Sequence, residues 1–273
     1  MLIGIDADQD VSHVAAQAVD KGVRIFCRYE KNLTAHEVMA IFAAGRAANC
    51  KVGILPIFET QAKRALTGSI GGHADGVVAA RMASGLGAPK GTALVGTIDF
   101  DAQPEDQAAV LGYLSGFKQG IAGSVFGEAD FKLCAYANGA ICQVALDTGV
   151  ADFAWVAGGS GMRGTKEFIA SGKAHIIQEV GDHRGLNLGI KIDSNYTLIA
   201  NDPEDLGCWV DSGAQPVTEI LPIPDVGSAQ ILPDLKDAQA GLQAAGLYSG
   251  AIDGLWGPIT AAAFAAYYAR NPS

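Results

Sequence analysis

Short apolar runs alternate with stretches of helical periodicity through most of the first 195 residues. The apolar runs predict eight strands, at residues 2–6, 23–29, 51–58, 92–101, 132–136, 153–157, 174–178 and 189–193. This alternation predicts an α/β fold, and eight strands favour a closed (β/α)8 TIM-like barrel over a doubly wound open sheet. The segment GDHRGLN between the last two strands is too short for a crossover helix, so the barrel could be irregular there.

Capping and turn residues place the helices between these strands. Thr34 followed by Glu37 predicts a capping box, in which the hydroxyl and the carboxylate each satisfy a free backbone N–H. The glycine-rich residues 68–72 are expected to form a flexible link before a helix from His73 to Leu86. Further helices are predicted over 11–21, 104–119, 140–146 and 166–171.

The strand at 92–101, TALVGTIDFD, ends in two acids, Asp99 and Asp101. Residues two apart on a strand share a face, so both carboxylates are expected to point the same way. The pair alone could simply cap the next helix, but functional residues of a (β/α)8 barrel sit where the strands end. Acids stand at four of the eight strand ends, more than helix capping would require. The candidate site residues at the strand ends are Asp6, Arg28, Tyr29, Glu59, Asp99, Asp101, Tyr136, Trp155, Gln178 and Asp193.

Composition and charge narrow the functional classes. The 273 residues carry a net charge of −10, and no basic stretch could neutralise phosphates, so nucleic acid is not an expected partner. The five cysteines are scattered and do not form a disulfide framework. The five histidines lack paired-ligand spacing, and we expect neither a metal nor another cofactor. The start MLIGIDADQD does not resemble a signal peptide, and no run is long enough for membrane insertion. We therefore expect a monomer made in the cytoplasm.

The chain changes character after residue 211. Residues 212–230 are proline-rich, lack helical periodicity and are predicted to be a linker. The segment 231–273 resembles the peptidoglycan-binding type 1 domain, a small three-helix module. The matching positions are Leu235, Gln239, Leu242, Gly246, Tyr248, Gly250, Asp253, Gly254, Gly257, Thr260, Ala263 and Tyr267. The resemblance implies peptidoglycan as the partner, and Tyr248, Asp253 and Trp256 are the candidate wall-binding residues.

Residues 1–211 are expected to form the barrel domain, and about the first 200 of them also resemble a family. The order GID, RY, PIFE, GGHADG and IDFD is similar to the glycoside-hydrolase-like barrel family, which is related to the family 25 lysozymes. The resemblance implies an acidic pocket that contains Asp6, Glu59 and Asp99, with Asp193 as the last-strand acid. Family 25 lysozymes end their fourth strand in Asp-x-Glu, whereas this chain has Asp99-x-Asp101. The proton donor is therefore left open between Glu59 and Asp101, with Asp99 as base, nucleophile or stabiliser.

Together these features predict a peptidoglycan hydrolase of the muramidase type, anchored on the wall by its tail. A start without a signal suggests a phage endolysin that reaches the wall or periplasm through a holin. Two alternatives stay open, a secreted antibacterial effector and a non-catalytic wall-binding protein with a degenerate barrel. The remaining strand-end residues, Arg28, Tyr29, Tyr136, Trp155, Gln178 and Asp193, are expected to bind the sugar.

Overall fold

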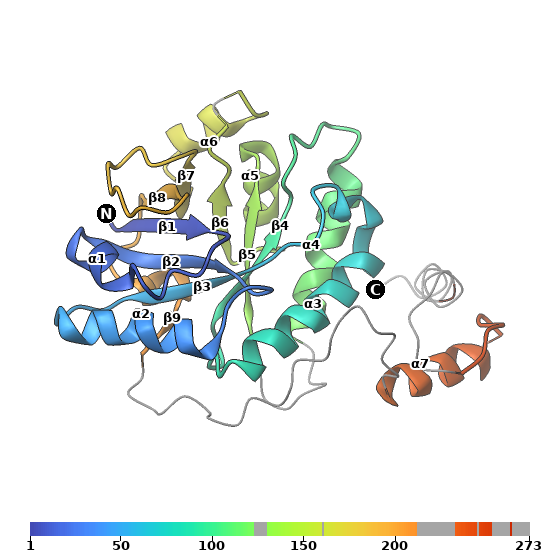
Figure 1. Ribbon diagram of the computed structural model, residues 1–273. Helices are drawn as coiled ribbons and strands as arrows, with labels where there is room; N and C mark the ends of the chain where they lie inside the picture. Colours follow the sequence, from blue (N-terminus) through green and yellow to red (C-terminus); the bar gives the residue numbers. More distant parts are fainter. Residues whose placement is uncertain (123–129, 160, 212–232, 245, 253–262, 264–273) are drawn as a thin grey trace. The chain divides into compact units, whose positions relative to one another are not determined.

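The computed structural model describes residues 1–122, 130–159, 161–211, 233–244, 246–252 and 263 (Figure 1). The chain divides into two compact units, residues 1–220 and 221–273, and each is considered by itself. The linker predicted at 212–230 lies outside the described residues. No helix in the described part of the chain is long and apolar enough to cross a membrane.

Eight strands of the first unit close into a barrel, as predicted. They are β1 (Ile3–Ala7), β2 (Val23–Tyr29), β3 (Gly53–Phe58), β4 (Ala93–Thr97), β5 (Lys132–Ala137), β6 (Phe153–Val156), β7 (Ile176–Glu179) and β8 (Asp193–Thr197). Neighbours follow the order β2-β1-β8-β7-β6-β5-β4-β3, and a β2–β3 pairing closes the ring. A short ninth strand, β9 (Trp209–Val210), lies antiparallel to β3.

Strands β1 to β7 are parallel, but β8 is antiparallel to both β1 and β7. The irregularity predicted between strands seven and eight is thus confirmed, whereas the predicted strand at 189–193 is wrong. The connection from β7 to β8 holds no crossover helix, so the chain turns back directly. Its Leu186, Leu188 and Ile192 are buried in the apolar cluster that also contains residues of β1, β2, α1 and α2.

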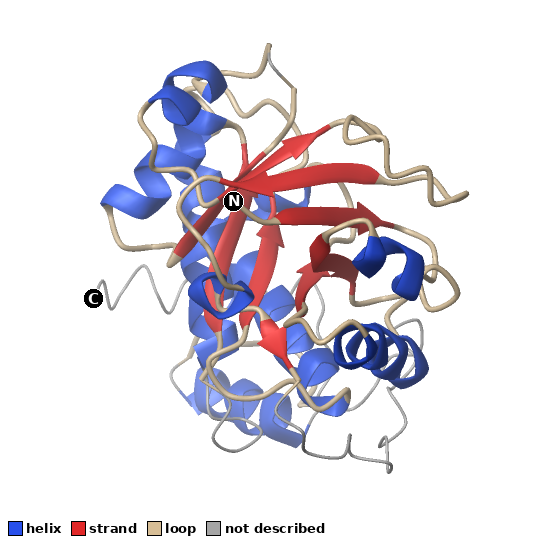
Figure 2. Cartoon of the chain, turned by 90° about the vertical axis from the view of Figure 1, so that its left-hand side faces the viewer, coloured by secondary structure: helices blue, strands red, loops and turns tan. Residues whose placement is uncertain are grey.

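Helices surround the barrel on the outside (Figure 2). They are α1 (Ala15–Asp20), α2 (Ala35–Ala47), α3 (Gly68–Gly85), α4 (Gln107–Ala122), α5 (Gly139–Asp147) and α6 (Thr165–Ala170), with 3-10 turns η1 (Arg64–Thr67) and η2 (Pro203–Leu206). Thr34 caps α2, because its hydroxyl accepts a hydrogen bond from the Glu37 backbone N–H at 3.2 Å. The second half of the predicted capping box is wrong, since the Glu37 carboxylate turns to Arg28 and Val11 instead.

The glycines at 68–72 do not form a flexible link; they are the first turns of α3, which packs along α4 (Figure 1). A Cβ on Gly72 would lie 1.9 Å from the Tyr113 carbonyl oxygen. A Cβ on Gly116 of α4 would lie 2.0 Å from the Ser69 carbonyl oxygen. Both glycines are therefore required by the close approach of two backbones, and not by a turn.

The second unit contains α7 (Pro233–Ala244). Gly246 has a φ of +69° and follows the helix, and the Leu247 N–H donates back to the Leu242 carbonyl at 2.9 Å. A glycine in the left-handed conformation commonly ends a helix in this way. Leu242, Tyr248 and Ala263 form a small apolar cluster.

Candidate active site

The barrel interior is filled by every second side chain of the strands, because successive side chains point to opposite faces. Ile25 and Cys27 of β2, Leu55 and Ile57 of β3, and Val95 of β4 belong to one buried cluster inside the ring. The same alternation sends the next inward position on these strands to the rim where the parallel strands end. Those positions are Tyr29, the last residue of β2, Thr97, the last residue of β4, and Glu59, which directly follows β3. Asp99 lies two residues beyond Thr97, in the loop after β4.

Electrostatic effects show which of the rim side chains lie together. Burial raises the pKa of the Tyr29 phenol, and nearby carboxylates raise it further; these belong to Glu59, Asp6, Asp99 and Asp8. Burial likewise raises the pKa of the Tyr136 phenol, and Asp99, Asp6 and Glu59 add to that shift. Charges act this way only at short range. Asp6, Glu59 and Asp99 therefore lie within electrostatic reach of both tyrosines at one rim, and we call this group of residues the acidic pocket.

Asp6 forms the deep end of this pocket and is 5 % exposed. Its carboxylate accepts hydrogen bonds from the Gln178 amide at 3.2 Å and the Asn195 amide at 2.8 Å. Burial is the main cause that raises the pKa of Asp6 to about 7, and the charge of Asp193 adds to this shift. The hydrogen bonds from the two amides and the charge of Arg28 oppose it. Asp6 can therefore hold or release a proton near neutral pH.

A hydrogen-bonded floor supports Asp6. The Tyr136 hydroxyl donates to the Gln178 side-chain oxygen at 2.8 Å. The Trp155 indole N–H donates to Asn195 at 2.9 Å, and the Tyr136 and Trp155 rings meet edge-on at 5.0 Å between centroids. Trp155 is 1 % exposed, so it lies beneath the pocket and does not offer its face to a sugar. Sequence reasoning missed Asn195, because it placed the eighth strand before this residue.

Glu59 is half-buried at the end of β3. Burial raises the pKa of Glu59, the charges of Asp99 and Asp8 raise it further, and Lys31 lowers it. Asp99, by contrast, is exposed. The two carboxyls thus differ in environment, one half-buried and one exposed, and paired acids of a glycosidase differ in this way.

Asp101 is not part of this group. Strand β4 ends at Thr97, so the alternation that was expected to align Asp99 and Asp101 does not continue to them. One Asp101 oxygen accepts hydrogen bonds from the Arg163 backbone N–H at 2.8 Å and the Asn138 amide at 2.9 Å. The hydrogen bond from Arg163 lowers the pKa of Asp101, and Asn138 and Gln103 add to this shift. Asp101 is held as a carboxylate that joins loops, which does not suit a proton donor.

Arg28 is buried between β2 and α2, and the structure does not support the substrate contact expected from this residue. Its neighbours Cys27 and Tyr29 belong to the interior cluster, so Arg28 points outward, toward the helices. Its Nε donates to Glu37 of α2 at 2.6 Å, and both side chains are completely buried. The alternation of side chains along β2 would have predicted the outward direction of Arg28 from the sequence alone.

Asp193 reaches the acidic rim because β8 is reversed. It pairs with Asp6 in the β1–β8 ladder, its carboxylate accepts the Gly181 N–H, and its charge raises the pKa of Asp6. As the first residue of an antiparallel strand, Asp193 lies at the same edge as the last residues of the parallel strands.

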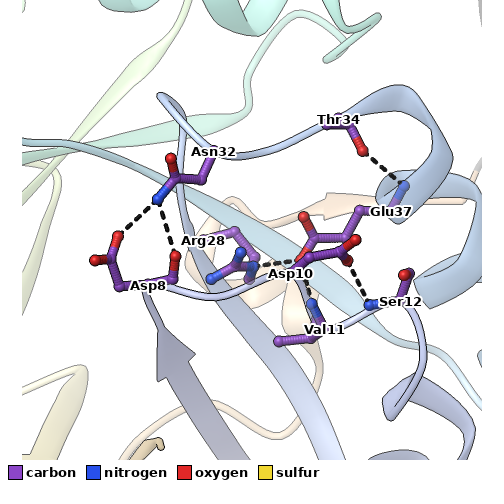
Figure 3. Close-up of polar contacts among 8 residues, drawn as sticks. All are labelled: Asp8, Asp10, Val11, Ser12, Arg28, Asn32, Thr34 and Glu37. Carbon is purple, nitrogen blue, oxygen red and sulfur yellow. Dashed lines mark hydrogen bonds and ion pairs between the residues drawn. The ribbon is translucent and has the colours of Figure 1, made fainter. Parts of the chain in front are cut away.

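Three further rim residues were missed: Asp8, Lys31 and Asn32. The Asn32 amide donates to the Asp8 backbone carbonyl at 2.9 Å and to its carboxylate at 2.7 Å, which holds the loop after β1 (Figure 3). Lys31 Nζ lies 3.8 Å from the Asp8 carboxylate and 5.1 Å from the centre of the Tyr29 ring. Their positions in the sequence could have identified them, because all three lie within three residues of the end of β1 or β2.

In the second unit, Tyr248 is 7 % exposed. Its hydroxyl donates to the Ala251 carbonyl at 2.7 Å and accepts from Gln239 at 3.1 Å. Tyr248 thus serves the interior of the module, and its expected role as an exposed wall contact is not supported. The other candidate wall-binding residues, Asp253 and Trp256, lie outside the described residues.

The fold and rim define a class: a closed α/β barrel with carboxylates gathered where its parallel strands end. The family described as "Rv2525c-like, glycoside hydrolase-like domain" has a model that matches residues 19–197. This match spans more than half of the chain, and the protein belongs to that family.

A solved structure has the same fold. It is the Mycobacterium tuberculosis Tat-secreted protein Rv2525c, crystallised in complex with L-tartrate. The TM-score is 0.56 and the identity 19 %, over 76 % of this chain and 98 % of that chain. At this identity the likeness shows the fold alone. The comparison with curated proteins found no match.

Proposed function

We propose that the barrel hydrolyses a glycosidic bond in the glycan of peptidoglycan. The observation that carries the proposal is the pairing of a half-buried Glu59, whose pKa is raised, with an exposed Asp99 close enough to raise it. Glycoside hydrolysis needs one protonated carboxyl at the leaving oxygen and one ionised carboxylate at the sugar carbon. Membership of a glycoside hydrolase-like family supports the same reaction class.

In this mechanism Glu59 donates its proton to the glycosidic oxygen as the bond to the sugar carbon breaks. Asp99, which is exposed, either attacks that carbon or directs a water molecule to it. Asp6 is more buried, and because its pKa is about 7 it can gain or lose a proton near neutral pH. Its protonation state would therefore change the net charge of the acidic pocket. Tyr29 and Tyr136 are half-buried at the rim and can contact the sugar.

The resemblance of the second unit to a peptidoglycan-binding module supports peptidoglycan as the polymer. Tethering raises the effective concentration of the glycan at the barrel without new catalytic contacts. A phage endolysin released at the wall, or a secreted effector, would both use this arrangement.

The test is clearing of a peptidoglycan suspension, followed by mass spectrometry of the products to identify the new reducing end. Wild type should clear the suspension, whereas Glu59→Gln and Asp99→Asn should each lose at least about 100-fold in rate. Glu167→Gln, which alters an exposed acid on α6, is the matched control and should clear normally. Asp101→Asn should retain more activity than Glu59→Gln, because Asp101 is tied to loops.

One observation favours a second candidate, a non-catalytic wall-binding protein. Asp101 stands where family 25 lysozymes carry their acid, and its carboxylate is engaged by Arg163 and Asn138. Sedimentation with peptidoglycan without clearing, unchanged by Glu59→Gln, would support this candidate.

A further inference from the structure

Lys31 is a cation placed at the mouth of an acidic pocket. It follows Tyr29, the last residue of β2, by two positions, and its ammonium stands over the Tyr29 ring at 5.1 Å. The side chain is 53 % exposed, and its ion pair with Asp8 is loose, at 3.8 Å. The tyrosine ring therefore positions the ammonium while leaving it open to solvent.

Two other basic side chains on loops of this rim are more fully engaged. Arg163 donates to the Ala102 carbonyl and to Gln107. Arg184 donates to Glu179 and stacks over the Tyr196 ring at 4.7 Å. The Lys31 ammonium retains donors for a ligand, since it has three N–H groups and one distant carboxylate.

The charge around Lys31 sets the kind of ligand that it can take. A negatively charged substituent would be repelled by Asp6, Glu59 and Asp99, except where a cation offsets them. The effect of Lys31 on the pKa of Glu59 shows that this cation lies within electrostatic reach of the pocket. A compact ammonium at that place suits a carboxylate.

We propose that Lys31 binds a carboxylate substituent of the glycan beside the bond that is cut, and so selects carboxylated over neutral glycans. This inference rests on the proposed glycosidase function and adds the substrate class. Tyr29 would contact the sugar ring, while Lys31 binds the carboxylate substituent of that sugar.

The test compares two soluble peptidoglycan fragments, one with free carboxylates and the same fragment with its carboxylates converted to amides. With Lys31→Met, KM for the carboxylated fragment should rise about tenfold, because the variant loses one charge-assisted hydrogen bond to the substrate. KM for the amidated fragment should stay within about twofold of wild type. Any change in kcat that follows from the altered pKa of Glu59 should be the same for both fragments. Lys31→Arg should restore most of the preference.

Lys90→Met is the matched control. Lys90 is 63 % exposed and also has a loose ion pair, 3.8 Å from Asp130, but it precedes β4 and lies at the opposite end of the barrel. An equal KM rise for both fragments, or the same rise with Lys90→Met, would overturn the proposal.

Binding measured by calorimetry on Glu59→Gln protein separates this inference from the proposed function. If wild type cuts neither fragment, the glycosidase proposal fails. A preference for the carboxylated fragment that disappears with Lys31→Met would still support the carboxylate site, and equal binding of both fragments would overturn it.

Discussion

Arg28 Nε donates to Glu37 Oε1 at 2.6 Å, and neither side chain is exposed. The pair joins β2 to α2, and the same Glu37 oxygen accepts the Val11 N–H at 3.0 Å, which ties down the loop after β1 (Figure 3). That loop carries Asp8 to the rim of the pocket. A buried ion pair adds little net stability, because desolvation offsets the attraction, but it defines where its partners lie.

Breaking this pair should be costly. Arg28→Met leaves a buried Glu37 carboxylate without its partner and should lower the free energy of unfolding by about 3–5 kcal/mol. The double variant Arg28→Met/Glu37→Leu removes both charges and should be more stable than Arg28→Met alone. Urea denaturation measures both values, and additive losses would contradict this account.

The contact between α3 and α4 predicts different outcomes for two glycines. Gly116→Ala places a Cβ 2.0 Å from the Ser69 carbonyl oxygen, so the helices must separate, at a cost of about 1–3 kcal/mol or more. Gly85→Ala meets nothing within 4 Å and should be neutral or stabilise by up to about 1 kcal/mol. Thermal unfolding of the two variants distinguishes them, and equal melting temperatures would argue against tight packing.

Asp6 should make stability depend on pH. Because its pKa is about 7 in the folded protein and near 3.8 when unfolded, the folded state holds this proton more tightly. Stability should therefore fall as pH rises from about 4 to 7, by roughly 4 kcal/mol at ~1.4 kcal/mol per pKa unit, and change no further above that range. Asp6→Asn should lack this component. Denaturation curves at several pH values give the difference, and parallel curves for the two proteins would refute it.

Asp8 and Lys31 should move the pKa of Glu59 in opposite directions. Asp8 raises it and Lys31 lowers it, so Asp8→Asn should lower the pKa and Lys31→Met should raise it. Titration of the Glu59 carboxyl carbon by NMR measures the shift directly, with Lys90→Met as an unshifted control. Two shifts of the same sign would mean that these residues act by disturbing the loop.

Local signals in the sequence were enough for most of the architecture. The strand Val23–Tyr29 was predicted with its observed bounds, and Thr34 was predicted as a helix cap, because period-two alternation and capping depend on near neighbours. Eight apolar runs separated by helical stretches also sufficed to predict the barrel. The barrel in turn places Asp6, Glu59 and Asp99 at one rim, since parallel strands end at the same edge.

Only the tertiary structure decided the rest. The reversal of β8, the loop contacts of Asp101 and the helical glycines of α3 each depend on residues far apart in the chain. Whether a carboxylate becomes a proton donor or a structural acceptor depends on the N–H groups and charges that folding brings beside it. The sequence by itself determined which acids were available and near which strand ends; their environments, and so their chemistry, were determined by packing between distant segments.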